Sequence, residues 1–374
     1  MRFDLTEEQE RVRETARRFL ENEAPLATLR KQFDRAEGFS RDWWRKISEL
    51  GWTGLGVPEG AGGFPLTGNV GQDLAIVAEE MGRLLAAGPF QPTVVVLDAL
   101  VQSPPGADSA PLDAIIAGES VIAWAFGEPG GRWDPASFQT QAQFVRDEVL
   151  IDGVKAYVEA GAEADVVLVT ARSERGLTQV LAPTDASGVT VFPGRSVDFV
   201  RRFAELRFES VRLPSSMIVG ERGASDKQVQ RQLQLALLLQ CAETNGAVER
   251  AFEFTVDYMR QRYAFGRPIA SYQALKHRLA DMLMWIHSCM ASVDAALVAF
   301  DAGAPETAEL VSVAKTYVGF KSSAIISDLV QLTGGIAVTW DHDLHLYERR
   351  VAVNRAMFGS PEQHRANVFQ LISA

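Results

Sequence analysis

Three arginines surround one aromatic residue at a break between two helical patterns. Arg260 and Arg262 end the first pattern, Arg267 precedes the second, and Phe265 lies between them. A glycine follows Phe265 and a proline follows Arg267; the first permits an unusual backbone conformation and the second disfavours the α conformation before it. Guanidinium groups beside an aromatic ring suit a bound phosphate or diphosphate. A helical hairpin with a solvated basic turn explains the same residues equally well.

A second candidate for chemistry is the carboxylate of Glu243. It interrupts a helical pattern over residues 231–261 whose apolar side chains point in nearly every direction, which predicts a helix buried all round. A buried carboxylate that is ionised and unpaired costs several kcal/mol, so it either finds a partner or its pKa rises. A raised pKa suits a base that works near neutral pH. The alternative is a carboxylate bonded to Thr244, to Asn245 or to an arginine from elsewhere.

The bulk composition limits the class of protein. The chain has 374 residues, of which 47% are hydrophobic, enough for the cores of two or three domains. A net charge of −11 argues against nucleic acid as the main partner, although clustered arginines still act on an anionic ligand at short range. The N-terminus lacks the apolar run of a signal peptide, and we find no run of about 18 apolar residues. We therefore expect a cytoplasmic protein with no membrane span.

The periodicity of apolar residues changes twice along the chain. Residues 1–118 show helical spacing, residues 119–215 form short alternating segments, and residues 216–374 return to long helical patterns. The close spacing of the middle segments predicts an antiparallel β-barrel or sandwich, with one hairpin that turns at Asp152-Gly153. The last part predicts a four-helix bundle. The expected fold is therefore α+β, in three domains with these boundaries.

Two histidines near the C-terminus raise the question of a metal. His342 and His345 lie beside Asp341 and Asp343. The two histidines are three residues apart, and no third ligand follows at a convincing spacing. We therefore expect no metal site.

The segment that begins at Arg262 resembles the second signature of the acyl-CoA dehydrogenase family. The matching residues are Arg262, Phe265, Gly266, Pro268, Ile269 and Gln273, followed by Leu-Ala-Asp-Met at 279–282. A later run with Gln331, Gly334 and Gly335 is similar to the family's loop that reaches across a subunit interface to the adenosine end of FAD. The helical, strand-rich, helical order is also the family's architecture. The resemblance implies a bound FAD whose diphosphate is held by Arg262, and it assigns the same cofactor to Phe265, Gln273, Gln331, Gly334 and Gly335.

The resemblance also implies an activity and partners. Members of the family oxidise an acyl-CoA to the trans-2-enoyl-CoA, with a glutamate as base, and pass electrons to an electron-transfer flavoprotein or a similar acceptor. A homo- or hetero-tetramer is expected. Residues 242–246 and 340–347 resemble members that act on steroid side chains, so the acyl group is expected to be bulky. Three arginines after this run are expected to pair with acidic groups across the oligomer: Arg349, Arg350 and Arg355.

The first signature of the family is only partly present. Residues 125–134 match it in outline, which assigns Phe126 and Gly127 to the cofactor. Trp133, however, stands where a serine usually contacts the thioester substrate. Glu159 replaces a threonine that normally faces the flavin, and a carboxylate near a reduced, anionic ring is electrostatically awkward.

The usual base is missing as well. Phe358 occupies the place of the common glutamate, and Ala236 occupies the place used by members whose base lies on the long helix. Glu243 lies on the same helical face as Ala236 but two turns further, roughly 10 Å along the axis. It resembles the base of the steroid-type members and is the best candidate, with Glu362 a weaker one.

Three hypotheses follow from these matches and departures. The chain is a catalytic FAD-dependent dehydrogenase for a bulky acyl group. Alternatively, it is a non-catalytic or half-competent subunit of a mixed oligomer and contributes FAD contacts to a partner chain. As a third alternative, it is a binding or structural protein that keeps the fold without the enzyme activity.

Overall fold

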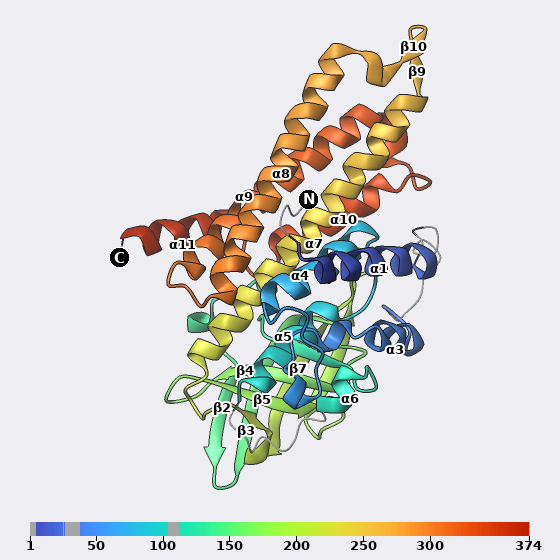
Figure 1. The fold of residues 1–374 in the computed structure, drawn as a ribbon. Helices are drawn as coiled ribbons and strands as arrows, with labels where there is room; N and C mark the ends of the chain where they lie inside the picture. The colour runs from blue at the N-terminus through green and yellow to red at the C-terminus, as the bar shows by residue number, and fades with distance from the viewer. Residues whose placement is uncertain (1–4, 25, 27–37, 104–111, 374) are drawn as a thin grey trace.

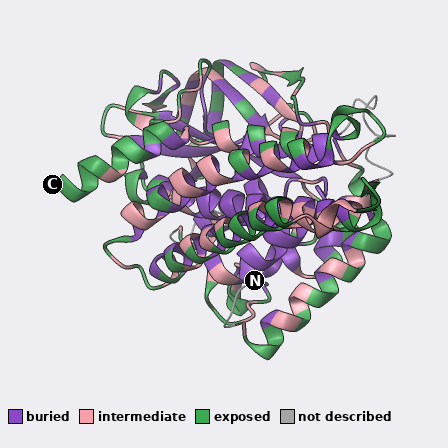
Figure 2. Cartoon of the chain, turned by 90° about the horizontal axis from the view of Figure 1, so that it is seen from above, coloured by how far each residue is buried: buried purple, intermediate pink, exposed green. Residues whose placement is uncertain are grey.

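The computed structural model describes residues 5–24, 26, 38–103 and 112–373, and it has the three-part architecture expected from the sequence (Figure 1). A group of N-terminal helices lies beside a β-sheet, and a bundle of long helices extends away from both. The predicted fold class is therefore confirmed. Buried residues gather where the three parts meet, and the outward faces of the helices are exposed (Figure 2).

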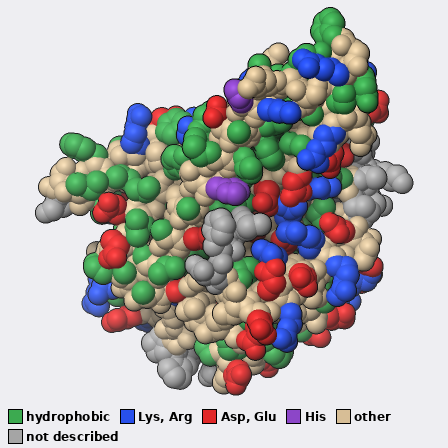
Figure 3. All heavy atoms as spheres, turned by 45° about the horizontal axis from the view of Figure 1, so that its top comes forward, with side chains coloured by type: hydrophobic (Ala, Val, Ile, Leu, Met, Phe, Trp, Pro, Cys, Tyr) green, Lys and Arg blue, Asp and Glu red, His purple; other side chains and the backbone are tan. Residues whose placement is uncertain are grey.

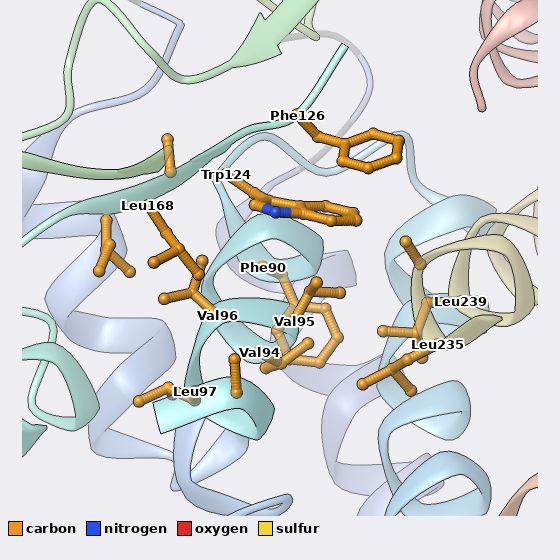
Figure 4. Close-up of a cluster of buried hydrophobic side chains, with 14 of the residues drawn as sticks. Phe90, Val94, Val95, Val96, Leu97, Trp124, Phe126, Leu168, Leu235 and Leu239 are labelled. Carbon is orange, nitrogen blue, oxygen red and sulfur yellow. The ribbon is translucent and has the colours of Figure 1, made fainter. Parts of the chain in front are cut away.

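The N-terminal part contains five described helices. They are α1 (Glu7–Glu23), α3 (Arg41–Glu49), α4 (Val70–Arg83), α5 (Phe90–Val101) and α6 (Leu112–Ile116). Helix α1 begins with the expected capping box, in which Thr6 Oγ1 accepts from the Gln9 backbone at 3.2 Å and the Gln9 side chain accepts from the Thr6 backbone at 3.1 Å. Helix α5 is buried on nearly all sides, between the sheet and the long helix of the bundle (Figure 4).

The middle part is one mixed sheet of eight strands. Its strands are β1 (Ile122–Ala125), β2 (Gln141–Val145), β3 (Glu148–Glu159), β4 (Val166–Arg172), β5 (Leu177–Pro183), β6 (Val189–Gly194), β7 (Phe203–Pro214) and β8 (Ile218–Val219). The order is β6-β7-β3-β2-β4-β5-β8, with β1 paired to β4. Most pairs are antiparallel, but β1 and β4 run parallel, which the short turns between the other strands did not reveal.

The predicted turn at Asp152-Gly153 is wrong. Strands β2 and β3 pair from Gln141 opposite Asp152 to Val145 opposite Glu148, so the chain turns at residues 146–147. Arg146 lies in this turn and has a positive φ of 55°. Gly153 instead sits at a register shift inside β3, with a φ of 143° and no room for a Cβ, which would meet Thr140 Cα at 2.6 Å.

The C-terminal part contains the bundle and a short terminal helix. Its helices are α7 (Asp226–Gln261), α8 (Gln273–Asp301), α9 (Thr307–Thr333), α10 (Leu344–Ala356) and α11 (Pro361–Ser373). A two-stranded hairpin, β9 (Tyr263–Ala264) and β10 (Arg267–Pro268), joins α7 to α8 at the far end of the bundle (Figure 1). In the described part of the chain, α8 alone is long and apolar enough to cross a membrane, and 44% of its apolar window is buried against the rest of the protein.

Helices α4 and α7 cross with their backbones in contact. A Cβ added to Gly82 would lie 2.0 Å from the carbonyl oxygen of Glu243, and one added to Gly246 would lie 2.0 Å from that of Glu79. Real Cβ atoms do not approach a carbonyl oxygen so closely. The two glycines therefore allow the N-terminal helices to reach the turn of α7 that carries Glu243.

This crossing predicts the effect of one added methyl group. Gly246→Ala should lower the free energy of unfolding by about 2 kcal/mol, because the neighbouring atoms are backbone and cannot move aside. Gly60→Ala is the control, since nothing lies within 4 Å of a Cβ at Gly60; its effect should stay within about 0.5 kcal/mol. Denaturant titration of both variants measures the difference. Equal stability of Gly246→Ala and the wild type would contradict the close crossing.

Candidate functional site

Arg262, Phe265 and Gln273 lie together at the exposed end of the bundle. Arg262 follows the last residue of α7, Phe265 is at the tip of the β9–β10 hairpin, and Gln273 begins α8. The Phe265 side chain is 97% exposed and its φ is 53°, a left-handed conformation that costs free energy in a non-glycine residue. Among the described residues no acidic group forms an ion pair with Arg262. Basic side chains lie among hydrophobic ones near this tip (Figure 3).

The glycine loop lies at the same end of the bundle. Helix α9 ends before Gly334, whose φ is 80°, and nothing lies within 4 Å of a Cβ built on Gly334 or Gly335. The chain then turns back past α7, where the rings of His342 and Tyr258 meet edge to face at 6.3 Å. Gln331, Gly334 and Gly335 are all exposed. The residues assigned to the adenosine and diphosphate end of FAD therefore form one exposed surface, open to a ligand that comes from outside this chain.

Glu243 lies far from this surface and is saturated with hydrogen bonds. Its side chain is 4% exposed. Oε1 accepts from Arg201 Nη2 at 3.1 Å and from Arg350 Nη1 at 2.6 Å. Oε2 accepts from Arg201 Nη2 at 2.9 Å, from Asn354 Nδ2 at 2.9 Å and from Gln91 Nε2 at 3.2 Å. Of the two alternatives raised by the sequence, the structure therefore shows the carboxylate bonded to arginines from elsewhere.

The cluster around Glu243 joins all three parts of the protein. Gln91 comes from α5, Arg201 from the segment between β6 and β7, and Arg350 from α10. Arg350 also pairs with Asp198, which precedes Arg201 in the same segment. Such a buried cluster requires every charge to keep its partner, because the loss of one leaves another uncompensated.

The expectation that the C-terminal arginines pair across an oligomer is wrong for Arg350. Arg350 binds Glu243 and Asp198 inside this chain, and its side chain is 1% exposed. Arg355 pairs with Glu362 on α11 at 2.9 Å. Glu362, the weaker candidate for the base, is thus an exposed partner of an arginine.

The two positions at which family members carry the base meet at one narrow cavity. Ala236 and Phe358 both line it, together with Glu159 and residues of α5 and β1. Its volume is about 20 Å³, room for about one water molecule. Glu243 lines a separate charged cavity with Arg201 and Arg350. The carboxyl group at the narrow cavity is therefore that of Glu159, which the sequence identified only as an awkward neighbour for a flavin.

Aromatic rings fill the space around the narrow cavity. Trp133 meets Phe358 at 5.3 Å between ring centroids and Tyr157 at 5.5 Å. Phe126 and Gly127 line the same cavity, and a Cβ on Gly127 would lie 2.5 Å from the Trp133 ring. A site for a drug-sized ligand is roughly 300–1,000 Å³. A flavin ring therefore does not fit against Phe126 and Gly127 unless Trp133 moves.

Trp133 also lies in the walls of two larger grooves. One groove of about 550 Å³ lies between the sheet and α10, with Tyr157 and Met357 in its walls. Another of about 640 Å³ lies against α11, with Phe358 and His364 in its walls. Trp133 lines both grooves and the narrow cavity.

The backbone around the narrow cavity is strained. Tyr157, Ala160 and Phe358 have positive φ values of 57°, 55° and 58°. The turn at Phe358 is held by Lys315, whose ammonium donates to the Met357 carbonyl at 2.9 Å, and by His364, whose Nε2 lies 2.9 Å from the Phe358 carbonyl. Burial lowers the pKa of Lys315 to about 8 and that of His364 to about 4. Buried side chains thus hold the turn that carries Phe358.

Glu159 is the titratable group of this cavity. Burial raises its pKa to about 7; Arg201 opposes the rise, and the charge of Glu243 adds to it. Its Oε1 lies 3.0 Å from Arg201 Nε, which makes the two groups an ion pair. Glu159 therefore keeps its proton up to about pH 7. The neutral form reduces the electrostatic repulsion expected between a carboxylate in this position and a reduced, anionic flavin.

The family models divide the chain as the structure does. Residues 6–104 match the N-terminal domain of acyl-CoA dehydrogenases, residues 123–211 the middle domain and residues 227–372 the C-terminal domain. The chain belongs to the acyl-CoA dehydrogenase family. Its relatives are flavin-dependent oxidoreductases. Among the described residues of this member, no group of three or more His, Cys, Asp or Glu side chains is arranged to hold a metal ion.

Individual relatives span nearly the whole chain. Acyl-CoA dehydrogenase IpdE2 of Mycolicibacterium smegmatis is 28% identical over 360 residues, which are 96% of this chain and 97% of the relative. A solved variant of the Tcur3481–Tcur3483 steroid acyl-CoA dehydrogenase is 25% identical, with a TM-score of 0.89 and 98% of each chain covered. The ChsE4–ChsE5 complex of Mycobacterium tuberculosis has a TM-score of 0.89 at 22% identity, covering 100% of this chain and 99% of that one, and shares the fold.

The raised pKa of Glu159 predicts how stability changes with pH. The folded state keeps the proton up to about pH 7, whereas the unfolded state loses it near 4.5, the ordinary pKa of a glutamate. The unfolded state therefore binds fewer protons between these values, and stability falls as pH rises through that window, by about 3 kcal/mol. Glu159→Gln should lack this part of the fall.

Denaturant titrations at about pH 5, near the lower edge of this window, and at about pH 8, above its upper edge, test the prediction. Glu148→Gln is a matched control because Glu148 is an exposed carboxylate on the same strand, and it should behave as the wild type. An equal loss of stability with pH in Glu159→Gln and in the wild type would show that Glu159 does not hold the proton.

Proposed function

We propose that the chain is part of a cytoplasmic, FAD-dependent tetramer that oxidises an acyl-CoA thioester to the trans-2-enoyl-CoA. A bulky, steroid-like acyl group is supported by the similarity to the solved steroid acyl-CoA dehydrogenase. An electron-transfer flavoprotein or a similar acceptor would reoxidise the flavin, as the family resemblance implies. The part that this chain plays in the assembly follows from the positions of its own residues.

Within the assembly, the chain acts as a half-competent subunit that gives FAD contacts to a sister chain. One observation carries this proposal: the cofactor residues divide into an exposed set and a closed set. Arg262, Phe265, Gln273, Gln331, Gly334 and Gly335 are exposed at the end of the bundle. Phe126 and Gly127 are buried at the narrow cavity. The exposed set suits a diphosphate and adenosine presented by a neighbour. Among the described residues no acidic group pairs with the Arg262 guanidinium, and the glycines admit close approach.

The reaction itself is expected to occur in the sister chain. Neither Ala236 nor Phe358 offers a carboxylate, and Glu243 uses both oxygens to hold Arg201 and Arg350. A sister chain with a small residue in place of Trp133 and a glutamate in place of Phe358 would supply what this chain lacks. The ChsE4–ChsE5 neighbour, a complex of two different chains, is in keeping with such an arrangement.

The visible spectrum of the purified protein tests the proposal. The chain alone should be colourless, and the chain co-expressed with a sister acyl-CoA dehydrogenase should carry the yellow colour of bound flavin. Arg262→Ala in this chain should lower the flavin content of the complex by tenfold or more, about 1.4 kcal/mol or more of lost diphosphate binding. Arg260→Ala is the control, since Arg260 is exposed and pairs with Asp257. Full flavin content in the Arg262 variant would contradict the assignment, and no flavin in any of these preparations would leave the non-enzymatic alternative.

Catalysis by this chain with its own FAD is the second candidate. It is favoured by one observation, the presence of a buried carboxylate on the face of α7 that carries Ala236, two turns away. If Glu243 is the base, Glu243→Gln should abolish flavin reduction by an acyl-CoA and leave flavin bound. If Glu243 is the structural group described above, the variant should instead lose about 3–5 kcal/mol of stability, because two guanidinium groups lose their shared partner. Stopped-flow reduction and denaturant titration of one variant separate the two roles.

A further inference from the structure

Glu159 stands in the wall between two cavities. The narrow cavity is lined by Glu159 and Gln91 on the side that faces α5 and α7. The charged cavity, lined by Arg201, Glu243 and Arg350, has Glu159 and Gln91 in its wall as well. These two side chains therefore form the partition between a space lined by aromatic rings and a space lined by ions.

The charges around this partition do not balance when Glu159 is ionised. The charged groups that face Glu159 come from the segment between β6 and β7, from α7 and from α10: Asp198, Arg201, Glu243 and Arg350. Three carboxylates then share two guanidinium groups. Glu243 accepts from both guanidiniums and Asp198 accepts from Arg350. Among the described residues, the contact found for Glu159 is the ion pair with Arg201 Nε. The wall of the charged cavity adds one group of each sign, Arg202 and Glu163, so the excess of one carboxylate remains. Glu163 accepts from the Gly38 backbone at 2.9 Å.

The backbone on each side of Glu159 can respond to a change in its charge. Tyr157 and Ala160 hold left-handed conformations, and the register of β3 against β7 shifts between Lys155 and Val158. The Tyr157 ring packs on Trp133 and is 42% exposed at the edge of the groove of about 550 Å³. Tyr157, two residues before Glu159, therefore connects this part of β3 to Trp133.

We propose that Glu159 is a proton-operated latch on the narrow cavity. With its proton the carboxyl keeps the partition closed, and Trp133 stays packed on Phe358. When the proton leaves to solvent, the third negative charge beside Glu243 and Asp198 draws water into the partition and releases residues 157–161, and Trp133 with them. The latch rests on the proposed function only for the identification of the narrow cavity with an active site. Opening of the cavity requires neither cofactor nor substrate.

Fluorine NMR of the full chain labelled with 5-fluorotryptophan tests the latch. The Trp133 signal, assigned by its loss in Trp133→Phe, should shift with a midpoint at a pH of about 7. In Glu159→Gln the signal should stay at the low-pH position throughout the titration. Glu163→Gln is the matched control, because Glu163 lines the charged cavity alone, and it should keep the transition. A transition that persists in Glu159→Gln, or a wild type without one, would overturn the proposal.

Infrared spectroscopy of the wild type gives a second measurement that does not depend on the stability of a variant. One neutral carboxyl band should disappear over the same pH range as the Trp133 shift. A shift of Trp133 without the loss of that band would assign the transition to another group and overturn the latch. Either result stands whether or not flavin binds, so failure of the latch and failure of the proposed function are distinguishable.

Discussion

The carboxylate of Glu243 is the charge on which the packing of the three domains depends. It brings together an amide from the N-terminal helices, one guanidinium from the middle domain and another from α10. Removing such a group would leave two buried guanidinium groups without their shared partner, at a large cost in stability. An exposed ion pair contributes little to stability. The backbone contact of α4 with α7 at the same turn requires glycine on both helices. One short stretch of α7 thus fixes the relative positions of all three parts.

The structure separates two tasks that the family resemblance places in one site. The end of the bundle is exposed and carries the residues assigned to the FAD diphosphate, while the narrow cavity is buried and closed by Trp133 and Phe358. Strained backbone at Tyr157, Ala160 and Phe358 is kept around the closed cavity, held by buried hydrogen bonds from Lys315 and His364. The narrow cavity therefore has Ala236 and Phe358 at the two positions where the resemblance expects a base, and its carboxyl group is that of Glu159.

The sequence predicted the architecture and the exposed half of the site because both depend on local signals. The periodicity, the capping box at Thr6 and the spacing from Arg262 to Gln273 are each read along the chain. The cluster at Glu243 and the cavity at Glu159 depend on residues that meet only in the folded state. Arg201 and Glu243 are 42 positions apart, and no local pattern couples them. The raised pKa of Glu159 likewise arises from burial among neighbours that the sequence does not place.

The central claim is that this chain binds one end of a cofactor whose flavin ring belongs to a different chain. Native mass spectrometry of the co-purified assembly tests it most directly, because the number of FAD molecules and of each chain is counted in one spectrum. The account predicts one FAD for each pair formed by this chain and its sister, and none on this chain alone. One FAD for every chain would contradict it and would mean that Trp133 yields its place to a flavin ring.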